Sequence, residues 1–277
     1  MNDKEILRVK NLVVDVKGKN GKRSEIIKNI SFELNKGECL GILGESGSGK
    51  SMSMKAILGL LDSHFIIRGS AYYKNMDLML ETPEKLRSYR GNDIAVILQN
   101  PMTCFDPLFR MEDQMKETWQ SHLNLSKREL HEKALSVLRT MQIPNERDVL
   151  RKYPHQLSGG MLQRITIGLA LSMEPEILIA DEPTSSIDAI TQFEIMKEFQ
   201  KIKEKCGTSM IFITHDLSVI SQVADRILVM NQGEIVDMGD FKHITTKAQD
   251  EYTRHLVRSK MMVMRQYNQV LQKGETL

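Results

Sequence analysis

The chain contains 277 residues, of which 41% are hydrophobic and 27% are charged, the ordinary balance of a globular protein with a sizeable core. The net charge is only +2 and the charges are interspersed, which argues against a nucleic-acid partner and neither favours nor excludes a membrane surface. No apolar run approaches the roughly 20 residues needed to span a bilayer, and the N-terminus lacks a signal-peptide pattern, so we expect a cytoplasmic protein.

The first part of the chain alternates apolar and polar positions in two stretches, which indicates two β-strands. Residues 6–16 predict one strand, a turn-rich segment follows over 17–23, and residues 26–34 predict the second. The apolar run 39–43 ends in glycines and predicts a buried parallel strand. Beyond these glycines apolar residues recur at helical spacing, namely Met52, Ala56, Ile57 and Leu60.

The middle of the chain, about 100–153, changes character and predicts a mostly helical insertion. Its helical stripe consists of Leu130, Ala134, Leu135, Leu138 and Met141. From about Ser158 strands and helices alternate again, with buried strands predicted at 177–180 and 210–213 and a helical tail from Asp250. The helix between these strands is expected to carry four residues on one face, Phe193, Met196, Phe199 and Ile202. This alternation predicts a parallel sheet with ligand chemistry at the carboxyl ends of its strands.

Residues 44–51 form a glycine-rich motif between a predicted strand and a predicted helix. They match the phosphate-binding pattern GxxxxGK[ST] at every fixed position. Glycines let successive N–H groups curl around phosphate oxygens, and the following helix directs its positive end to the same place. We expect Lys50 to contact the β- and γ-phosphates and the Ser51 hydroxyl to bind Mg²⁺. The motif alone leaves kinases, GTPases and ATPases open, and its predicted nucleotide-binding residues are Gly44, Glu45, Ser46, Gly47, Ser48, Gly49, Lys50 and Ser51.

Two carboxylates, Asp181 and Glu182, directly follow the predicted strand 177–180. In a chain with a phosphate-binding loop, a carboxylate at the end of a buried strand is placed to hold Mg²⁺, a role that we assign to Asp181. Glu182 is placed to polarise the attacking water as a general base. Because a kinase or GTPase would not usually need the second carboxylate, the pair favours ATP hydrolysis.

The segment 157–164 reads Leu-Ser-Gly-Gly-Met-Leu-Gln-Arg and resembles the LSGGQ signature motif of ABC ATPases. Ser158, Gly159 and Gly160 offer a hydroxyl and backbone donors at a helix N-terminus, which makes a second anion-binding turn. In the family that the motif resembles, this turn caps the γ-phosphate held by the phosphate-binding loop of a partner subunit. The resemblance therefore implies a dimer with shared active sites.

Further positions resemble the other ABC motifs in the family's order, over about residues 6–240. Gln99 resembles the Q-loop glutamine that contacts Mg²⁺ and water and leads into the helical subdomain. The segment Ser186-Ile187-Asp188 resembles the D-loop at the dimer interface. His215 resembles the switch histidine that contacts the γ-phosphate.

Two positions depart from the family pattern. Met161 replaces the usual Gln, which is tolerable because the backbone and Ser158 contact the phosphate. Val16 stands where an aromatic ring usually stacks on adenine. Base stacking is therefore expected to be weaker, or to come from another residue.

The resemblance implies an α/β fold of the P-loop NTPase class (ABC ATPase), with a RecA-like mixed-sheet core, an antiparallel N-terminal β-subdomain and an inserted α-helical subdomain. The expected ligands are ATP and Mg²⁺. The expected catalytic residues are Glu182, His215, Lys50 and Gln99; Ser51, Gln99 and Asp181 are expected at the metal, and Ser158, Gly159, Gly160 and Asp188 at the nucleotide. The expected domains are the N-terminal β-subdomain and first part of the core (1–99), the helical signature subdomain (100–158), the signature helix and second part of the core (159–240), and a helical tail (241–277).

Several segments resemble the peptide/nickel importer branch of the family, namely 99–101, 105–108, 153–161 and 252–256. In that branch two different ATPase subunits pair beneath two permeases that an extracytoplasmic solute-binding protein supplies, and the partner of this chain is expected to be a paralogous or identical ATPase subunit. The resemblance thus implies a peripheral subunit at the cytoplasmic face of the membrane. Peptide-importing members commonly carry a cysteine-rich C-terminal segment. Because no cysteine follows Cys206 here, we favour nickel or another metal complex over oligopeptides as the solute.

Three residues, Phe105, Pro107 and Leu108, are candidates for the surface that receives the permease, with a buried role in the helical subdomain as the alternative. The rival function of another class is a non-transport ABC ATPase, which the lack of a long coiled coil or a second ATPase module disfavours. The histidines and the cysteines Cys39, Cys104 and Cys206 show no metal-ligand spacing, and the methionines fit core or helix filling. The transported metal is therefore not expected to bind to this chain.

Overall fold

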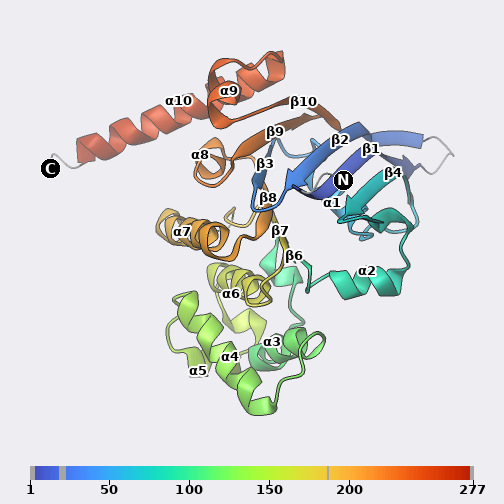
Figure 1. Cartoon of the computed structure of the whole chain (residues 1–277). Coiled ribbons are helices and arrows are strands. Elements are labelled where there is room, and N and C mark those ends of the chain that lie inside the picture. Colours follow the sequence, from blue (N-terminus) through green and yellow to red (C-terminus); the bar gives the residue numbers. More distant parts are fainter. Residues whose placement is uncertain (1–3, 19–22, 186, 275–277) are drawn as a thin grey trace. The chain divides into compact units, whose positions relative to one another are not determined.

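The computed structural model describes residues 4–18, 23–185 and 187–274, without the side chains of 189–190, 204–206 and 263–274. The chain divides into two compact units. Unit 1 combines Met1–Glu81 with Ser209–Leu277, the blue-to-teal and orange-to-red parts of Figure 1, and unit 2 comprises Thr82–Thr208. Each unit is described below by itself.

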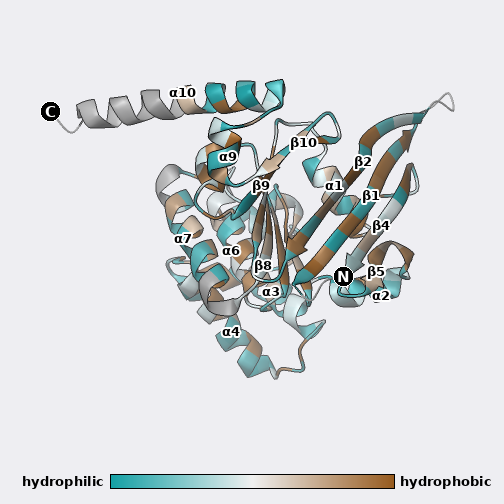
Figure 2. Cartoon of the chain, turned by 45° about the horizontal axis from the view of Figure 1, so that its top comes forward, coloured by the Kyte–Doolittle hydropathy of each residue, from teal (hydrophilic) through white to brown (hydrophobic). Residues whose placement is uncertain are grey.

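Unit 1 contains an antiparallel sheet built from the N-terminal strands. β1 (Glu5–Lys17) lies between β2 (Arg23–Asn35) and β4 (Phe65–Tyr73), and β5 (Met76–Asp77) pairs with the far edge of β4. Buried residues alternate with more exposed ones along much of β1 and β2. Figure 2 shows that hydrophobic (brown) and hydrophilic (teal) residues alternate along the same strands. The two predicted N-terminal strands are confirmed, whereas β4 and β5 were not predicted.

A second set of strands in unit 1 is mainly parallel and fully buried at its centre. β3 (Cys39–Leu43) pairs in parallel with β8 (Ser209–Thr214) on one side and with β9 (Arg226–Asn231) on the other. β10 (Glu234–Gly239) runs antiparallel to β9, which makes the sheet mixed. Every residue of β3 and β8 is buried, as expected for strands covered on both faces. The strands predicted at 39–43 and 210–213 are confirmed.

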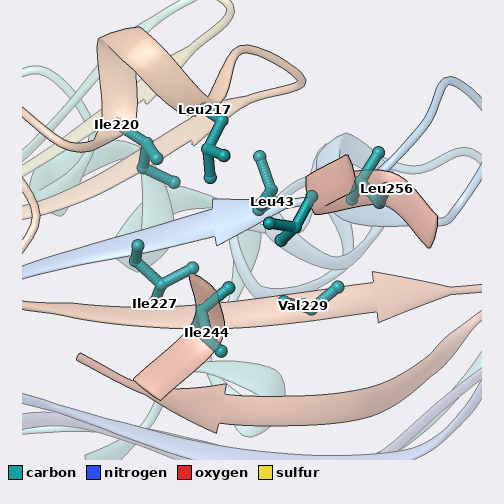
Figure 3. Close-up of a cluster of buried hydrophobic side chains, with 8 residues drawn as sticks. Leu43, Leu217, Ile220, Ile227, Val229, Ile244 and Leu256 are labelled. Atoms are coloured by element: carbon teal, nitrogen blue, oxygen red, sulfur yellow. The ribbon is translucent and has the colours of Figure 1, made fainter. Parts of the chain in front are cut away.

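The helices of unit 1 are α1 (Lys50–Ile57), α8 (Leu217–Ile220), α9 (Phe241–Thr246) and α10 (Glu251–Gly274), with a short 3₁₀ turn at Leu78–Leu80. The predicted helical tail is thus confirmed. Side chains from β3, β9, α8, α9 and α10 meet in one buried cluster, shown in Figure 3. Its members are Leu43, Leu217, Ile220, Ile227, Val229, Ile244, Leu256 and Val257. This cluster joins the C-terminal helix to the strand that enters the glycine-rich motif.

Unit 2 combines a parallel strand pair with helices. β6 (Ile94–Ile97) pairs with β7 (Ile177–Asp181), which confirms the strand predicted at 177–180. The segment between them is helical wherever it is regular, as predicted for about 100–153, and Leu130, Ala134, Leu135 and Leu138 are buried. The helices of the unit are α2 (Pro83–Tyr89), α3 (Met111–Gln120), α4 (Lys127–Thr140), α5 (Glu146–Arg151), α6 (Gly159–Leu171) and α7 (Ala189–Cys206), with 3₁₀ turns at Pro101–Thr103 and Pro154–Gln156.

Two residues expected on buried helix faces lie elsewhere. Leu60 is 42% exposed and follows α1, because the chain turns at Gly59, whose φ of +62° ends the helix. Phe193 on α7 is 55% exposed, and the Lys197 ammonium lies 4.3 Å from its ring centre. Within the described part of the chain, no helix combines the length and the apolar character that crossing a membrane requires.

Candidate active site

The loop 44–49 connects β3 directly to α1 and has the curled backbone that its glycines predict. Gly47 and Gly49 have φ angles of +83° and +105°, a region that residues with a Cβ avoid. Position 44 requires glycine for a steric reason, because a Cβ there would collide with the Met230 carbonyl oxygen and with Ser48 Oγ. The loop therefore needs these three glycines for its shape.

The interior of this loop contains a buried ammonium and a buried hydroxyl, both of which can donate to an anion. The Lys50 ammonium is buried and donates to the carbonyl oxygens of Gly44 and Glu45, at 2.8 Å each. Ser48 Oγ is buried without a hydrogen-bond partner among the described atoms, although such groups are nearly always satisfied. An anion with several oxygens, such as a phosphate chain, would satisfy the hydroxyl and draw the ammonium away from the carbonyls.

His215 lies at the same sheet edge as this loop. β3 and β8 are parallel, and Leu43 pairs with Thr214, so Gly44 and His215 both leave the sheet at its carboxyl edge. The His215 side chain is exposed. The chain beyond it is fixed because the Asp216 carboxylate accepts from Ser218 N at 2.8 Å and Oγ at 2.7 Å. In unit 1, the phosphate-binding loop and His215 are thus brought to one edge.

Unit 2 gathers the predicted carboxylates and the glutamine at one edge in the same way. Ile97 of β6 pairs with Ala180 of β7, so Gln99, Asp181 and Glu182 lie at the carboxyl ends of neighbouring parallel strands, with Asp181 as the last residue of β7. Asp181 and Glu182 are 6% and 8% exposed, whereas Gln99 is exposed. Glu182 has a φ of +49°, an unusual value for a residue with a Cβ and one that occurs at functional turns.

The signature-like turn of unit 2 starts helix α6. Ser158 caps the helix, its hydroxyl accepting from Met161 N at 3.3 Å. Apart from the adjacent residues and the backbone of its own helix, a Cβ added to Gly159 or Gly160 would meet no described atom within 4 Å. Packing within this chain therefore does not explain the two glycines, and the helix N-terminus is open to an outside group. Asp188, also exposed, caps α7 by accepting from Thr191 N at 3.0 Å, while Ser186 of the predicted D-loop lies outside the described residues.

Sequence reasoning missed an aromatic residue next to Val16. Phe65 of β4 pairs directly with Val16 of β1, and both side chains are partly exposed. Opposite residues of an antiparallel pair project from the same face, so an aromatic ring does stand beside Val16. Recognising β4 as the neighbour of β1 would have revealed it.

A cavity of about 350 Å³ lies in unit 2, next to the segment that follows β6. Its lining includes Leu98, Cys104, Phe105, Gln114, Thr118 and Thr166. Phe105 is only 8% exposed, which supports its buried role, whereas Leu108 is 79% exposed on the same segment together with Phe109 at 55%. Of the predicted docking residues, Pro107 and Leu108 are therefore at the surface and Phe105 is not.

Comparison with known proteins places these features in a family. A family model described as "ABC transporter" matches residues 27–185. The chain is 36% identical over 246 residues to the metal-staphylopine import system ATP-binding protein CntD of Staphylococcus aureus (strain NCTC 8325 / PS 47), covering 89% of this chain and 91% of that protein. It is 41% identical over 257 residues to the dipeptide transport ATP-binding protein DppD of Bacillus subtilis (strain 168), covering 92% and 76%.

A solved structure supports the fold. The dimeric post-hydrolysis state of the ATP-binding cassette MJ0796, bound to ADP and Pi, matches with a TM-score of 0.76 and 27% identity, covering 85% of this chain and 98% of that one. The predicted α/β P-loop NTPase fold is thereby confirmed.

Proposed function

The chain belongs to the ABC transporter family, and from this premise we propose that it is the ATP-hydrolysing subunit of an importer for nickel or another metal, taken up as a chelate. The staphylococcal relative, which is named for metal-staphylopine import, supports a metal chelate as the solute. Dipeptide or oligopeptide import is the second candidate, favoured by the 41% identity to DppD. Copurifying the membrane complex and identifying the ligand on its solute-binding protein would distinguish the two.

The observation that carries the ATP-binding proposal is the loop 44–51 with its unpartnered Ser48 hydroxyl. Bound phosphate would replace the loop carbonyls as the partner of the Lys50 ammonium, because a charged oxygen is the stronger acceptor. The N–H groups of the loop and the first turn of α1 would hold the same oxygens. Mg²⁺ prefers oxygen ligands and neutralises phosphate charge, and its proposed ligands are Ser51, Asp181 and Gln99.

Hydrolysis is proposed to depend on four residues with different tasks. Glu182 accepts the proton of the attacking water as general base, and Gln99 orients that water. His215 and Lys50 stabilise the charge that develops on the γ-phosphate. The backbone turn at Glu182 and the fixed chain beyond His215 support these positions, since catalysis of phosphoryl transfer is mostly positioning and electrostatics.

The signature turn is proposed to serve a partner subunit. Ser158, Gly159 and Gly160 would contact the γ-phosphate bound to the partner's phosphate-binding loop, with Asp188 near the interface. The open space at both glycines supports this role, because backbone N–H groups can then approach an outside anion closely. Hydrolysis removes the γ-phosphate that both subunits contact, so the dimer opens, and this opening drives the transporter. The partner is proposed to be a paralogous or identical ATPase subunit.

The membrane partners are proposed to dock on unit 2. Two permeases would receive solute from an extracytoplasmic binding protein, and this chain would lie at the cytoplasmic face of the membrane. The 350 Å³ cavity and the exposed side chains of Leu108 and Phe109 offer an apolar surface for a permease helix. This placement is peripheral and involves no membrane-spanning helix of the described residues.

Replacing the proposed base tests the mechanism. Glu182→Gln should retain ATP binding and lose hydrolysis by about 10²- to 10⁴-fold, because the amide cannot accept the proton. ATP binding and phosphate release by the assembled complex measure the two effects. Lys50→Ala is the matched comparison, which should lose nucleotide binding itself. Prompt turnover by the Glu182→Gln complex would rule out the base assignment, and undiminished ATP affinity of Lys50→Ala would rule out the loop.

A further inference from the structure

The C-terminal helix contacts the phosphate-binding loop through one side chain. The backbone N–H of Glu45, the second residue of the loop, donates to the Tyr252 hydroxyl oxygen at 2.9 Å. Tyr252 lies in the first turn of α10, and 207 positions separate the two residues. The mechanism proposed above assigns no role to this hydroxyl.

The first turn of α10 is held firmly enough to act as an anchor. The Asp250 carboxylate accepts from Tyr252 N at 2.9 Å and from Thr253 N at 3.3 Å, which caps the helix. Leu256 and Val257, further along α10, are buried with Leu43, and Figure 3 shows Leu43 and Leu256 in the same cluster. Leu43 directly precedes the loop, and the Tyr252 ring packs against this cluster. The helix is therefore fixed to the same strand that carries the loop.

The contact holds one side of the Gly44–Glu45 peptide unit, whose other side has a partner that must move. The Gly44 carbonyl, in the same peptide unit as the Glu45 N–H, accepts from the Lys50 ammonium at 2.8 Å, and the Glu45 carbonyl of the next unit does the same. When Lys50 turns to a bound phosphate, both carbonyls lose this partner. The Tyr252 hydroxyl and the bond from Gly233 N to the Ser48 carbonyl, at 3.0 Å, do not depend on Lys50.

We propose that Tyr252 is a positioning residue for ATP binding, which holds the Glu45 peptide in place while Lys50 exchanges the loop carbonyls for phosphate. The inference rests on the proposed role of the loop in binding ATP. It makes the start of α10 a part of the nucleotide site. Burial of the ring raises the pKa of Tyr252 and outweighs the hydrogen bond from the Glu45 N–H, which lowers it, so the phenol is neutral at physiological pH as an ordinary tyrosine is.

Tyr252→Phe tests this role because it removes the hydroxyl and keeps the ring. In the purified full-length chain, affinity for a non-hydrolysable ATP analogue should fall by about two- to tenfold, the range of one hydrogen bond, and nearer the lower value because the contact is solvent-exposed. Hydrogen exchange of the Glu45 amide without nucleotide should also become faster. Faster exchange confined to the Glu45 amide would indicate loss of this one bond, whereas a general loosening of α10 would also speed the exchange of amides along the helix.

Thr253→Val is the matched control from the same helical turn. The Thr253 hydroxyl is fully buried without a hydrogen-bond partner among the described atoms, so its loss should leave affinity and Glu45 exchange at wild-type values. Equal effects of the two variants would overturn the proposal, as would an affinity of Tyr252→Phe for the ATP analogue equal to that of wild type, whatever the exchange rate of the Glu45 amide. A wild-type chain that binds no ATP analogue would instead overturn the proposed function and this inference together.

Discussion

The side chain opposite Val16 is the aromatic ring of Phe65, on the neighbouring strand of the antiparallel sheet. A ring at this position offers a flat apolar face, and base–aromatic stacking contributes about 1–3 kcal/mol for each base. We propose that Phe65 supplies the stacking contact that Val16 lacks. The partial exposure of both side chains leaves the face open to a ligand.

Phe65→Leu should separate base recognition from phosphate recognition. Leucine keeps apolar packing in β4 and loses the ring, so affinity for ATP should fall by about three- to tenfold. Affinity for inorganic tripolyphosphate, which has no base, should stay at the wild-type value. Calorimetric titration of both ligands measures the difference. Parallel losses for the two ligands would show that Phe65 acts on the fold rather than on the base.

At the scale of elements, strands with a continuous or alternating apolar pattern were predictable, and strands with an interrupted pattern were not. β3, β7 and β8 are continuous apolar runs next to glycine, carboxylate or histidine, so local sequence marks both their type and their ends. β4 was missed because Arg68, Gly69 and Ser70 interrupt its pattern. Gly69 has a φ of +111° beside a register shift between β1 and β4, an irregularity set by strand pairing.

Among the site residues, those in contiguous motifs were predicted, whereas contacts between residues far apart in the sequence were not. The loop 44–51 and the pair Asp181–Glu182 were predicted because each motif is contiguous and follows a buried strand. The contact between Glu45 and Tyr252 spans 207 positions, and Phe65 reaches Val16 only through strand pairing. Neither has a periodicity or spacing that sequence reading could use. Such contacts become visible only with the tertiary structure.

Helices α3 and α4 are joined by a carboxylate with two basic neighbours. Glu112 of α3 pairs with Lys116 one turn away and with His131 Nδ1 of α4 at 2.7 Å. Burial raises the pKa of Glu112, but the hydrogen bonds from Lys116 and His131 outweigh it, so the pKa lies below its ordinary value of 4.5. The stabilisation is therefore present above pH 4.5 and is lost as the pH falls through the lowered pKa.

Glu112→Gln should remove this pH dependence. At pH 7 the variant should be less stable than wild type by up to about 1 kcal/mol, since the pair is only partly buried. The difference should shrink toward zero in acid, where wild-type Glu112 is itself neutral. Thermal unfolding at a series of pH values measures both curves. A difference that is constant across the series would exclude the ion pairs as its cause.

At the scale of the whole molecule, the residues proposed for ATP binding and hydrolysis are divided between the two units. Unit 1 carries the phosphate-binding loop and His215, and unit 2 carries Gln99 and the acidic pair. The signature turn in unit 2 offers a further helix N-terminus, with open space at both of its glycines. If both turns bind phosphate, as proposed above, the chain needs either two anions or a second subunit. The similar ATP-binding cassette MJ0796 is dimeric in its solved structure, and a dimer is the arrangement that we propose here.

Gly160→Asp tests which nucleotide the signature turn serves. The added carboxylate meets no described atom of this chain within 4 Å of its Cβ, so the fold and the chain's own loop 44–51 should be unaffected. Affinity of the isolated chain for ATP should therefore equal that of wild type.

In the assembled transporter the carboxylate would repel the γ-phosphate of the partner's ATP. Turnover should then fall at least by about half, because one of two shared sites is lost. Phosphate release by the complex, beside nucleotide titration of the single chain, measures the two effects. If ATP binding by the isolated Gly160→Asp chain were lost, the turn would serve its own nucleotide and the shared-site arrangement would be wrong.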